Sequence, residues 1–333
     1  MVDHVSFKIG DKIHNDLNET LEENLGKSGI ANSFCVVGAS ARGRLHYHND
    51  TPRDDAFVIH FDGTWLAAAV ADGAGSRKLS RHGASLLAKK LCIRLLNAIN
   101  SSHVLGHIAD RDPEIHDDNS SLTSMKSGLR PVIVQLGEQF TDQTNTEKQS
   151  YLENLMLHAF QQSRHDLQQF AKSKNTPLDD FHSTLLGLLL NTKTDEMCVG
   201  QVGDGLMFAL DDMGKVIKLT EPPSTDDPAA SYFITQKDWE NYKDIKTIDS
   251  RDVNHFSTIY LMTDGVANDC QYGPPPNILE IWAKDMDREI RLVPSIKITA
   301  ERLKSYLSSY KAKSSFDDRT LVVIFRKRDG EIT

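Results

Sequence analysis

Short apolar runs separated by turn residues set the pattern of most of the chain. Each run is rich in Val, Ile, Leu or Phe and is bounded by Gly, Asp, Asn or Pro, which is typical of buried strands. Several runs follow one another at hairpin-like intervals, so we expect antiparallel pairing. In chain order the predicted strands are SFCVVGAS, DAFVIHF, TWLAAAVAD, STLLGLLLN, EMCVGQVGDG, LMFAL, KVIKLT, STIYLMTDG and RTLVVIFRK.

Helical spacing of apolar residues marks a smaller number of segments. From Ala84 to Ala98 they recur at the period of an amphipathic helix, for which Ser76 or Ser80 is a suitable N-cap. One face of this helix must pack on a sheet. Further helices are predicted at about 148–173, 277–286 and 297–310.

Three stretches break these patterns. Residues 1–30 are polar and weakly periodic, so we interpret them as an N-terminal extension or a short helix outside the core. Residues 100–147 are rich in Ser, Asp and Asn and are interpreted mostly as a surface insertion. Residues 220–255 carry prolines and charges between two strand-rich regions.

Composition narrows the function classes. Asp plus Glu number 47 against 38 for Lys plus Arg, and the net charge of -9 argues against nucleic acid or an anionic membrane as the main partner. The four cysteines form no CxxC pair, which disfavours structural zinc and a disulfide framework. We found no signal-peptide core and no apolar run of membrane-spanning length, so we expect a cytoplasmic protein.

Acidic residues flank many of the predicted strands. A single Asp in such a place is usually a turn residue or a solvated strand end. Together they suggest more, because carboxylates that converge at one edge of a sheet repel each other unless a cation neutralises them. Oxygen-only ligands favour Mg²⁺ or Mn²⁺. The acids are Asp54, Asp55, Asp72, Asp204, Asp264, Asp317 and Asp318.

Six short segments that contain these acids or lie between them, taken in chain order, resemble the motifs of the metal-dependent type 2C (PPM) Ser/Thr protein phosphatases, and most closely those of the bacterial branch. They are RDDAF, VADGAGS, HSTLLGLLL, VGDG, LMTDGVAND and FDDRTLVVI. The resemblance covers about residues 33–327. It implies one α+β domain, placed at residues 31–327, that is a four-layer α-β-β-α sandwich of two antiparallel sheets flanked by helices. PAASYFIT, within 220–255, resembles the flap of the family.

The resemblance also implies an activity and a dinuclear metal site. The expected reaction is hydrolysis of phosphoserine or phosphothreonine in proteins by water activated at two Mn²⁺ or Mg²⁺ ions. Asp72 would bridge the two ions, the Gly73 carbonyl and Asp54 would serve one of them, and Asp264 and Asp317 the other. Asp72, Asp264 and Asp317 are thus the expected catalytic residues.

Other matching positions are expected to support the site. Asp55 resembles an acid of the outer coordination sphere, Thr184 the threonine of the family's S-T strand, and Asp204 its GD turn. Asp318 stands where the family commonly has Asn. The family also implies a phosphorylated protein substrate, a cognate Ser/Thr kinase and a monomer.

The chain departs from the family at three places. A phosphate-binding Arg of the family falls on Asp50, so Arg42, Arg44 and Arg53 are the candidates to replace it. A histidine proposed as general acid falls on Ala74, and His46 or His82 could take its role. A further metal ligand falls on Asn268, with Asp269 one residue later; those two lie in the motif LMTDGVAND.

Two alternatives were weighed. A catalytically weak type 2C-like phosphoprotein-binding or regulatory module would need a broken metal site, yet its main acids are present. A cysteine-dependent phosphatase needs a C-x5-R loop, whereas Arg42 follows Cys35 at the wrong spacing.

Overall fold

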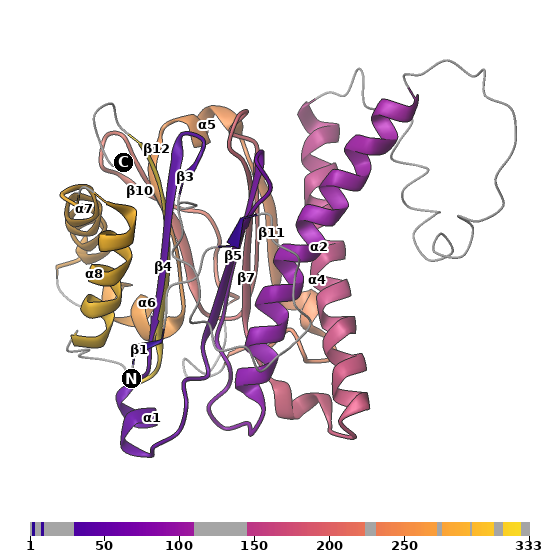
Figure 1. Cartoon of the computed structure of the whole chain (residues 1–333), viewed down its shortest axis with the longest axis vertical. Helices are drawn as coiled ribbons and strands as arrows, with labels where there is room; N and C mark the ends of the chain where they lie inside the picture. Colours follow the sequence, from indigo (N-terminus) through magenta and orange to yellow (C-terminus); the bar gives the residue numbers. More distant parts are fainter. Residues whose placement is uncertain are drawn as a thin grey trace, which may run out of the picture.

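The computed structural model describes two layers of sheet enclosed by helices (Figure 1). The described residues are 2–3, 8–9, 30–109, 145–223, 231–271, 275–293, 295–309 and 316–327. Most of the predicted extension 1–30, most of the predicted insertion 100–147 and part of the flap-like segment therefore lie outside the described residues.

The first sheet is antiparallel and has five principal strands. Hydrogen bonded in this order, they are β4 (Phe34–Ala41), β13 (Arg319–Arg326), β12 (Phe256–Met262), β9 (Leu206–Asp211) and β10 (Val216–Lys218). Two short strands, β1 (Val2–Asp3) and β3 (Ile30–Ala31), pair with β4.

The second sheet also has five principal antiparallel strands. In order they are β11 (Lys243–Ile248), β8 (Met197–Val202), β7 (Leu185–Asn191), β6 (Trp65–Ala71) and β5 (Ala56–Phe61). The short strand β2 (Lys8–Ile9) adds to β5 in parallel.

Helices cover the outer face of each sheet (Figure 1). The long helices α2 (Ser80–Ala109) and α4 (Asn145–Ser173) pack on the second sheet. On the first sheet lie α7 (Ile278–Arg291) and α8 (Ile296–Ser309). The shorter elements are α1 (Arg44–His48), η1 (Leu178–Phe181), η2 (Trp239–Tyr242), α5 (Ser250–Asn254) and α6 (Asp264–Gln271). The α+β sandwich expected from the sequence is confirmed.

Strand β6 shows why its sequence is apolar at every position. Leu66, Ala68 and Val70 belong to the core between the sheets, while alternate residues such as Ala67 and Ala69 belong to the core beneath α2 and α4. A strand that is buried on both faces cannot alternate apolar with polar residues. The small alanines let α2 approach the sheet closely.

The predicted strands all form. The two-residue strands β1, β2 and β3 are additional, so parts of the predicted extension 1–30 pair with the sheets. The longer strand β11 is additional as well. It lies in the segment 220–255, where the sequence predicts no strand, and all its residues are only half-buried. It pairs along its length with β8 at the edge of the sheet. The helices are longer than predicted: α2 continues to Ala109 and α7 to Arg291. Among the described residues, no helix combines the length and the apolar character needed to cross a bilayer.

Candidate metal centre

Strand register gathers the acids of both sheets at one end of the sandwich. Ala56 pairs with Ala71, so Asp55 and Asp72 are the next residues beyond the paired ends of β5 and β6. In the other sheet the Thr263 N–H donates to the Thr320 carbonyl over 3.1 Å. Asp264 therefore leaves β12 beside the start of β13, which Asp317 and Asp318 precede.

Asp55 joins the two sheets from inside. Its Oδ2 accepts hydrogen bonds from the hydroxyls of Thr263 at 2.8 Å and Thr320 at 2.6 Å, both of the opposite sheet. The side chain is buried, and this burial together with the charge of Asp318 raises its pKa to about 7. The supporting role expected of Asp55 stays a prediction. The two threonines were not singled out from the sequence, although each lies within one of the motifs: Thr263 in LMTDGVAND and Thr320 in FDDRTLVVI.

Asp318 is the most firmly anchored acid of the group. Its Oδ1 accepts from the Gly43 N–H at 2.6 Å and its Oδ2 from the Asp54 N–H at 2.5 Å. Burial alone would raise the pKa of Asp318, but His46 and these two amides outweigh burial and lower it. Asp318 thus holds the chain segments that carry Gly43 and Asp54 against the start of β13.

His46 reaches this acidic edge from α1. Its Nδ1 lies 2.9 Å from Asp318 Oδ1 and its Nε2 lies 3.6 Å from Asp54 Oδ2. The interaction with Asp318 raises the pKa of His46 to about 9 despite burial. Of the two histidines considered as substitutes at Ala74, His46 is therefore the one beside the acids. For His82, burial and the neighbouring Arg81 lower the pKa, and no contact with these acids is seen.

Asp72 and Gly73 lie where chain packing is tightest. The Asp72 N–H donates to Thr184 Oγ1 at 3.0 Å, and its carbonyl accepts from the Thr184 N–H at 2.9 Å. A Cβ at Gly73 would come within 2.9 Å of the Asp54 carbonyl oxygen and of the backbone of Ser80. Only glycine allows this approach, which keeps the Gly73 backbone next to the acids.

The turn that carries Asp204 is held against the same strand. Gly203 has φ of +112°, a left-handed conformation that suits glycine, and a Cβ there would lie 2.5 Å from that of Thr184. The buried Gln201 amide donates to the carbonyls of Gly203 and Gly205 at 2.9 and 2.8 Å. Thr184 therefore lies against the segments of both Asp72 and Asp204, and the supporting roles of Thr184 and Asp204 stay predictions.

The carboxyl groups strongly perturb one another. Burial raises the pKa of Asp72 well above its usual range, and the charges of Asp55, Asp264 and Asp317 raise it further. Burial likewise raises the pKa of Asp264 well above its usual range, with added repulsion from Asp204 and Asp317. For Asp317, burial is also the leading cause of a raised pKa. The two sheets thus converge on an edge with an excess of negative charge.

Three buried carboxylate oxygens at this edge have no hydrogen-bond partner in the described part of the chain. They are Oδ1 of Asp55, of Asp204 and of Asp264. Buried oxygens without partners are costly unless a cation or water satisfies them. The donor set is dominated by carboxylates, with the Gly73 backbone beside them, which suits hard divalent ions. The residues present therefore fit the implied metals.

The three candidate arginines differ in position. Arg53 is buried and its guanidinium donates to Ser40 Oγ and to the Asp55 carbonyl. Arg42 donates to the Thr51 carbonyl at 3.1 Å and lies over the ring of Tyr47. Arg44 is exposed on α1. Arg42 and Arg53 thus brace the loop around α1, and phosphate binding by any of the three stays a prediction.

The residue pair Asn268 and Asp269 is ordered by α6. Asn268 lies one turn after Asp264, and its Nδ2 donates to Asp264 Oδ2 at 3.3 Å. Asp269 instead faces Cys270 and Tyr306, whose pKa values its charge helps to raise. A one-residue shift that would bring Asp269 to the acidic edge is therefore not seen.

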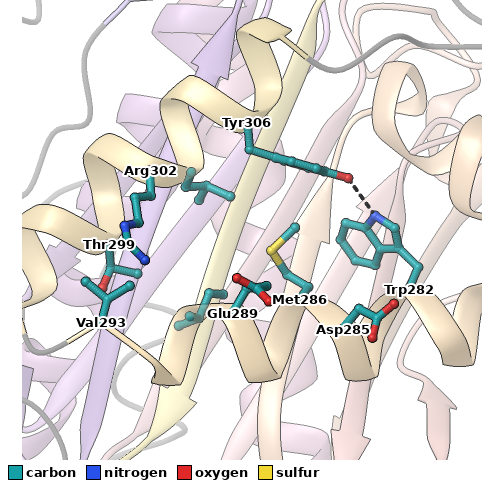
Figure 2. Close-up of a pocket in the computed structure, with 10 residues that line it drawn as sticks. Trp282, Asp285, Met286, Glu289, Val293, Thr299, Arg302 and Tyr306 are labelled. Carbon is teal, nitrogen blue, oxygen red and sulfur yellow. Dashed lines mark hydrogen bonds between the residues drawn. The ribbon is translucent and has the colours of Figure 1, made fainter.

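A cavity lies on the outer side of the first sheet, between α7 and α8 (Figure 2). Its volume is about 370 Å³. Its lining includes Trp282, Met286, Leu303 and Tyr306, and the Trp282 indole N–H donates to the Tyr306 hydroxyl at 3.1 Å. It contains none of the acids described above.

Comparison with known proteins identifies the family of this fold and site. The sequence profile described as Protein phosphatase 2C matches residues 42–308, which is most of the chain. The chain belongs to the protein phosphatase 2C family. This membership confirms the resemblance read from the motifs and supports phosphatase function.

Solved structures agree with this protein phosphatase 2C assignment at the level of the fold. The serine/threonine phosphatase of S. agalactiae superposes with a TM-score of 0.51 at 12% identity, covering 88% of this chain and 100% of that one. A bacterial serine phosphatase gives 0.50 at 10% identity, covering 88% and 97%. No curated protein sequence matched this chain.

Proposed function

We propose that this protein phosphatase 2C chain is a metal-dependent phosphatase that hydrolyses phosphoserine and phosphothreonine in proteins. The observation that carries the proposal is the set of buried, mutually repelling carboxylates at the end of the sandwich, three of which have an oxygen without a partner. Bound cations would neutralise such a set and satisfy its oxygens, and the family couples such cations to phosphate ester hydrolysis.

Asp54, Asp72, Gly73, Asp264 and Asp317 would hold two Mn²⁺ or Mg²⁺ ions, with Asp72 between them. When bound, such a pair lowers the pKa of a shared water and neutralises charge on the phosphoryl oxygens. Asp55 and Thr184 fix the segments of the metal-binding acids through the hydrogen bonds described above. The described residues contain no exposed thiol, since all four cysteines are buried, so we assign no covalent intermediate on sulfur.

The proposal extends to the setting of the reaction. A phosphorylated protein is the substrate, a Ser/Thr kinase supplies the phosphoryl group that is removed, and the enzyme works as a monomer in the cytoplasm. The acidic edge itself favours a substrate whose phosphate is received by bound cations rather than by a basic pocket, because Arg42 and Arg53 already engage other groups.

Hydrolysis of p-nitrophenyl phosphate and of a phosphothreonine peptide tests the proposal. The protein is treated with a chelator, desalted, and assayed with no metal, with Mg²⁺ and with Mn²⁺. We expect no turnover without metal and recovery with Mn²⁺ or Mg²⁺ on both substrates. Absence of turnover under all conditions, in protein that stays folded by circular dichroism, would favour a non-catalytic phosphoprotein-binding module instead.

A further inference from the structure

The imidazole of His46 lies in an unusual position for a simple structural histidine. Its side chain is 8% exposed, and its Nδ1 is fully buried and makes no hydrogen bond, although Asp318 Oδ1 lies only 2.9 Å away. At that distance a well-aligned N–H would donate to the carboxylate. The nitrogen and the oxygen thus lie side by side without a hydrogen bond between them, at a point where both could be ligands of one cation.

Asp317 completes the group around this point. One ligand atom each from His46, Asp317 and Asp318 lies within 4.8 Å of the others. Ligands at about 2.1 Å from an octahedral ion are separated by about 3.0 Å when adjacent and about 4.2 Å when opposite. The 2.9 Å between His46 Nδ1 and Asp318 Oδ1 is close to the separation of adjacent ligands, and the 4.8 Å limit exceeds that of opposite ligands by about 0.6 Å, so binding one ion requires small movements of the side chains.

The backbone holds this group in place without an ion. Asp318 receives the Gly43 and Asp54 amides, and each of its oxygens keeps a lone pair for a further partner. His46 is held by α1, whose following turn is fixed by the Thr51 N–H donating to the His46 carbonyl at 2.9 Å. A preorganised set of ligands of this kind binds metal at a small cost in ordering.

We propose that His46, Asp317 and Asp318 form a third divalent metal site, selective for nitrogen-preferring transition ions such as Zn²⁺ or Co²⁺ over Mg²⁺. An imidazole ligand confers this preference, because Mg²⁺ favours oxygen ligands. The site shares Asp317 with the proposed dinuclear centre but uses two side chains that the centre does not. Water would complete the coordination sphere.

An ion at this site would tie α1 to the start of β13. It would also fix the imidazole beside the turn after Asp72, since a Cβ at Gly75 would lie 3.9 Å from His46 Nε2. The entrance to the acidic edge would then be bordered by a metal-bound histidine. The competing account is an ion pair between His46 and Asp318 with no metal.

Cobalt binding in excess Mg²⁺ separates the two accounts. Mg²⁺ fills the oxygen-only positions, and Co²⁺ is followed by its visible absorption and by elemental analysis after desalting. The variant is His46→Gln, and His48→Gln on the exposed side of the same helix is its matched control. We expect one Co²⁺ per chain in the wild type and in His48→Gln, and at least about tenfold weaker binding in His46→Gln.

Asp318→Asn provides a second test that leaves the imidazole in place. We expect it to weaken Co²⁺ by about tenfold as well, with unchanged circular dichroism. Equal Co²⁺ affinity and identical spectra in the wild type, His46→Gln and Asp318→Asn would overturn the proposal in favour of the plain ion pair. Because the readout is metal binding, protein that binds Co²⁺ at His46 yet hydrolyses no phosphate ester would support this site while contradicting the proposed function.

Discussion

The acidic edge and the cavity between α7 and α8 are two regions of opposite character. The cavity is roomy, its wall is mostly apolar, and its rim acid Asp285 is paired with Arg288 at 3.0 Å. At the acidic edge, carboxylates face one another and three buried oxygens lack partners. The comparison teaches that open volume shows where a molecule fits, whereas uncompensated buried charge shows where the fold expects a cation and where chemistry is concentrated.

The largest expected effect comes from neutralising Asp72. Asp72→Asn removes the charge placed between the two proposed ions, so we expect activity to fall by about a thousandfold or more. Met286→Leu, a volume-conserving change in the wall of the cavity, is the matched control and should leave activity within about twofold. Steady-state kinetics with p-nitrophenyl phosphate in saturating Mn²⁺ measures both. A comparable loss of activity in Met286→Leu would contradict the assignment of catalysis to the acidic edge rather than to the cavity.

Adding one carbon beside the acids and one at the cavity compares how tightly the two regions are packed. A Cβ at Gly265 would collide with the Asp318 carbonyl, whereas Val293 borders the open cavity. We expect Gly265→Ala to lower the free energy of unfolding by about 2–3 kcal/mol and Val293→Ile to change it by less than about 1 kcal/mol. Urea unfolding followed by tryptophan fluorescence measures the free energy of unfolding of both variants. If Gly265→Ala is as stable as the wild type, the packing around the acids is looser than described.

Asp318→Asn should have a smaller effect on activity than Asp72→Asn. Asparagine keeps an oxygen for one of the two backbone amides, and the family commonly carries it at this position, so we expect about a tenfold loss of kcat/KM, or about 1.4 kcal/mol. The same assay in parallel gives the ratio of the two variants. Equal losses would mean that Asp318, not Asp317, is the acid of the pair that serves the proposed dinuclear centre.

The smallest effect is a pH dependence of metal stabilisation. In the metal-free protein Asp55 has a pKa of about 7, and those of Asp72 and Asp264 are also raised, against about 3.9 in the unfolded chain. The folded state therefore binds protons on these three carboxyl groups more tightly than the unfolded chain does. Their protonation contributes to the free energy of unfolding below pH 4, and this contribution is lost as pH rises through the pKa values of the folded state. Cations remove the repulsion that then develops.

We therefore expect the gain in Tm on adding Mn²⁺ to the chelated protein to be larger at pH 7.5 than at pH 5, by a few degrees. Differential scanning calorimetry at both pH values measures it. Asp72→Asn, with one titrating acid fewer, should show a smaller difference between the two values. A gain that is the same at both pH values would indicate that these acids are not titrating in the folded protein.

Many strands could be predicted from the sequence because a strand that is buried on both faces of its sheet has a continuous run of apolar residues. β6 and β7 are apolar at nearly every position, and such runs predict strands without any knowledge of their neighbours. β11 has no such run, since an edge strand with half-buried residues needs only backbone pairing with β8. Its sequence, KDIKTI, could not be distinguished from a charged loop.

The candidate site likewise has residues that the sequence could predict and contacts that it could not. The acids were found because each follows or precedes a strand within a recognisable motif. The hydroxyls of Thr263 and Thr320 meet Asp55 only after the two sheets pack, so no local pattern shows their role. Likewise, no sequence spacing brings His46 to Asp318, because that contact depends on α1 folding under the start of β13.

Electron paramagnetic resonance of the Mn²⁺-loaded protein tests most directly whether the acidic edge is a two-metal centre. Two Mn²⁺ ions bridged by one carboxylate lie roughly 3.5–4 Å apart and couple magnetically. We predict a spin-coupled spectrum at two equivalents of Mn²⁺ in the wild type and in Met286→Leu, and only the spectrum of isolated Mn²⁺ in Asp72→Asn. An uncoupled spectrum in the wild type at every Mn²⁺ concentration would contradict the account.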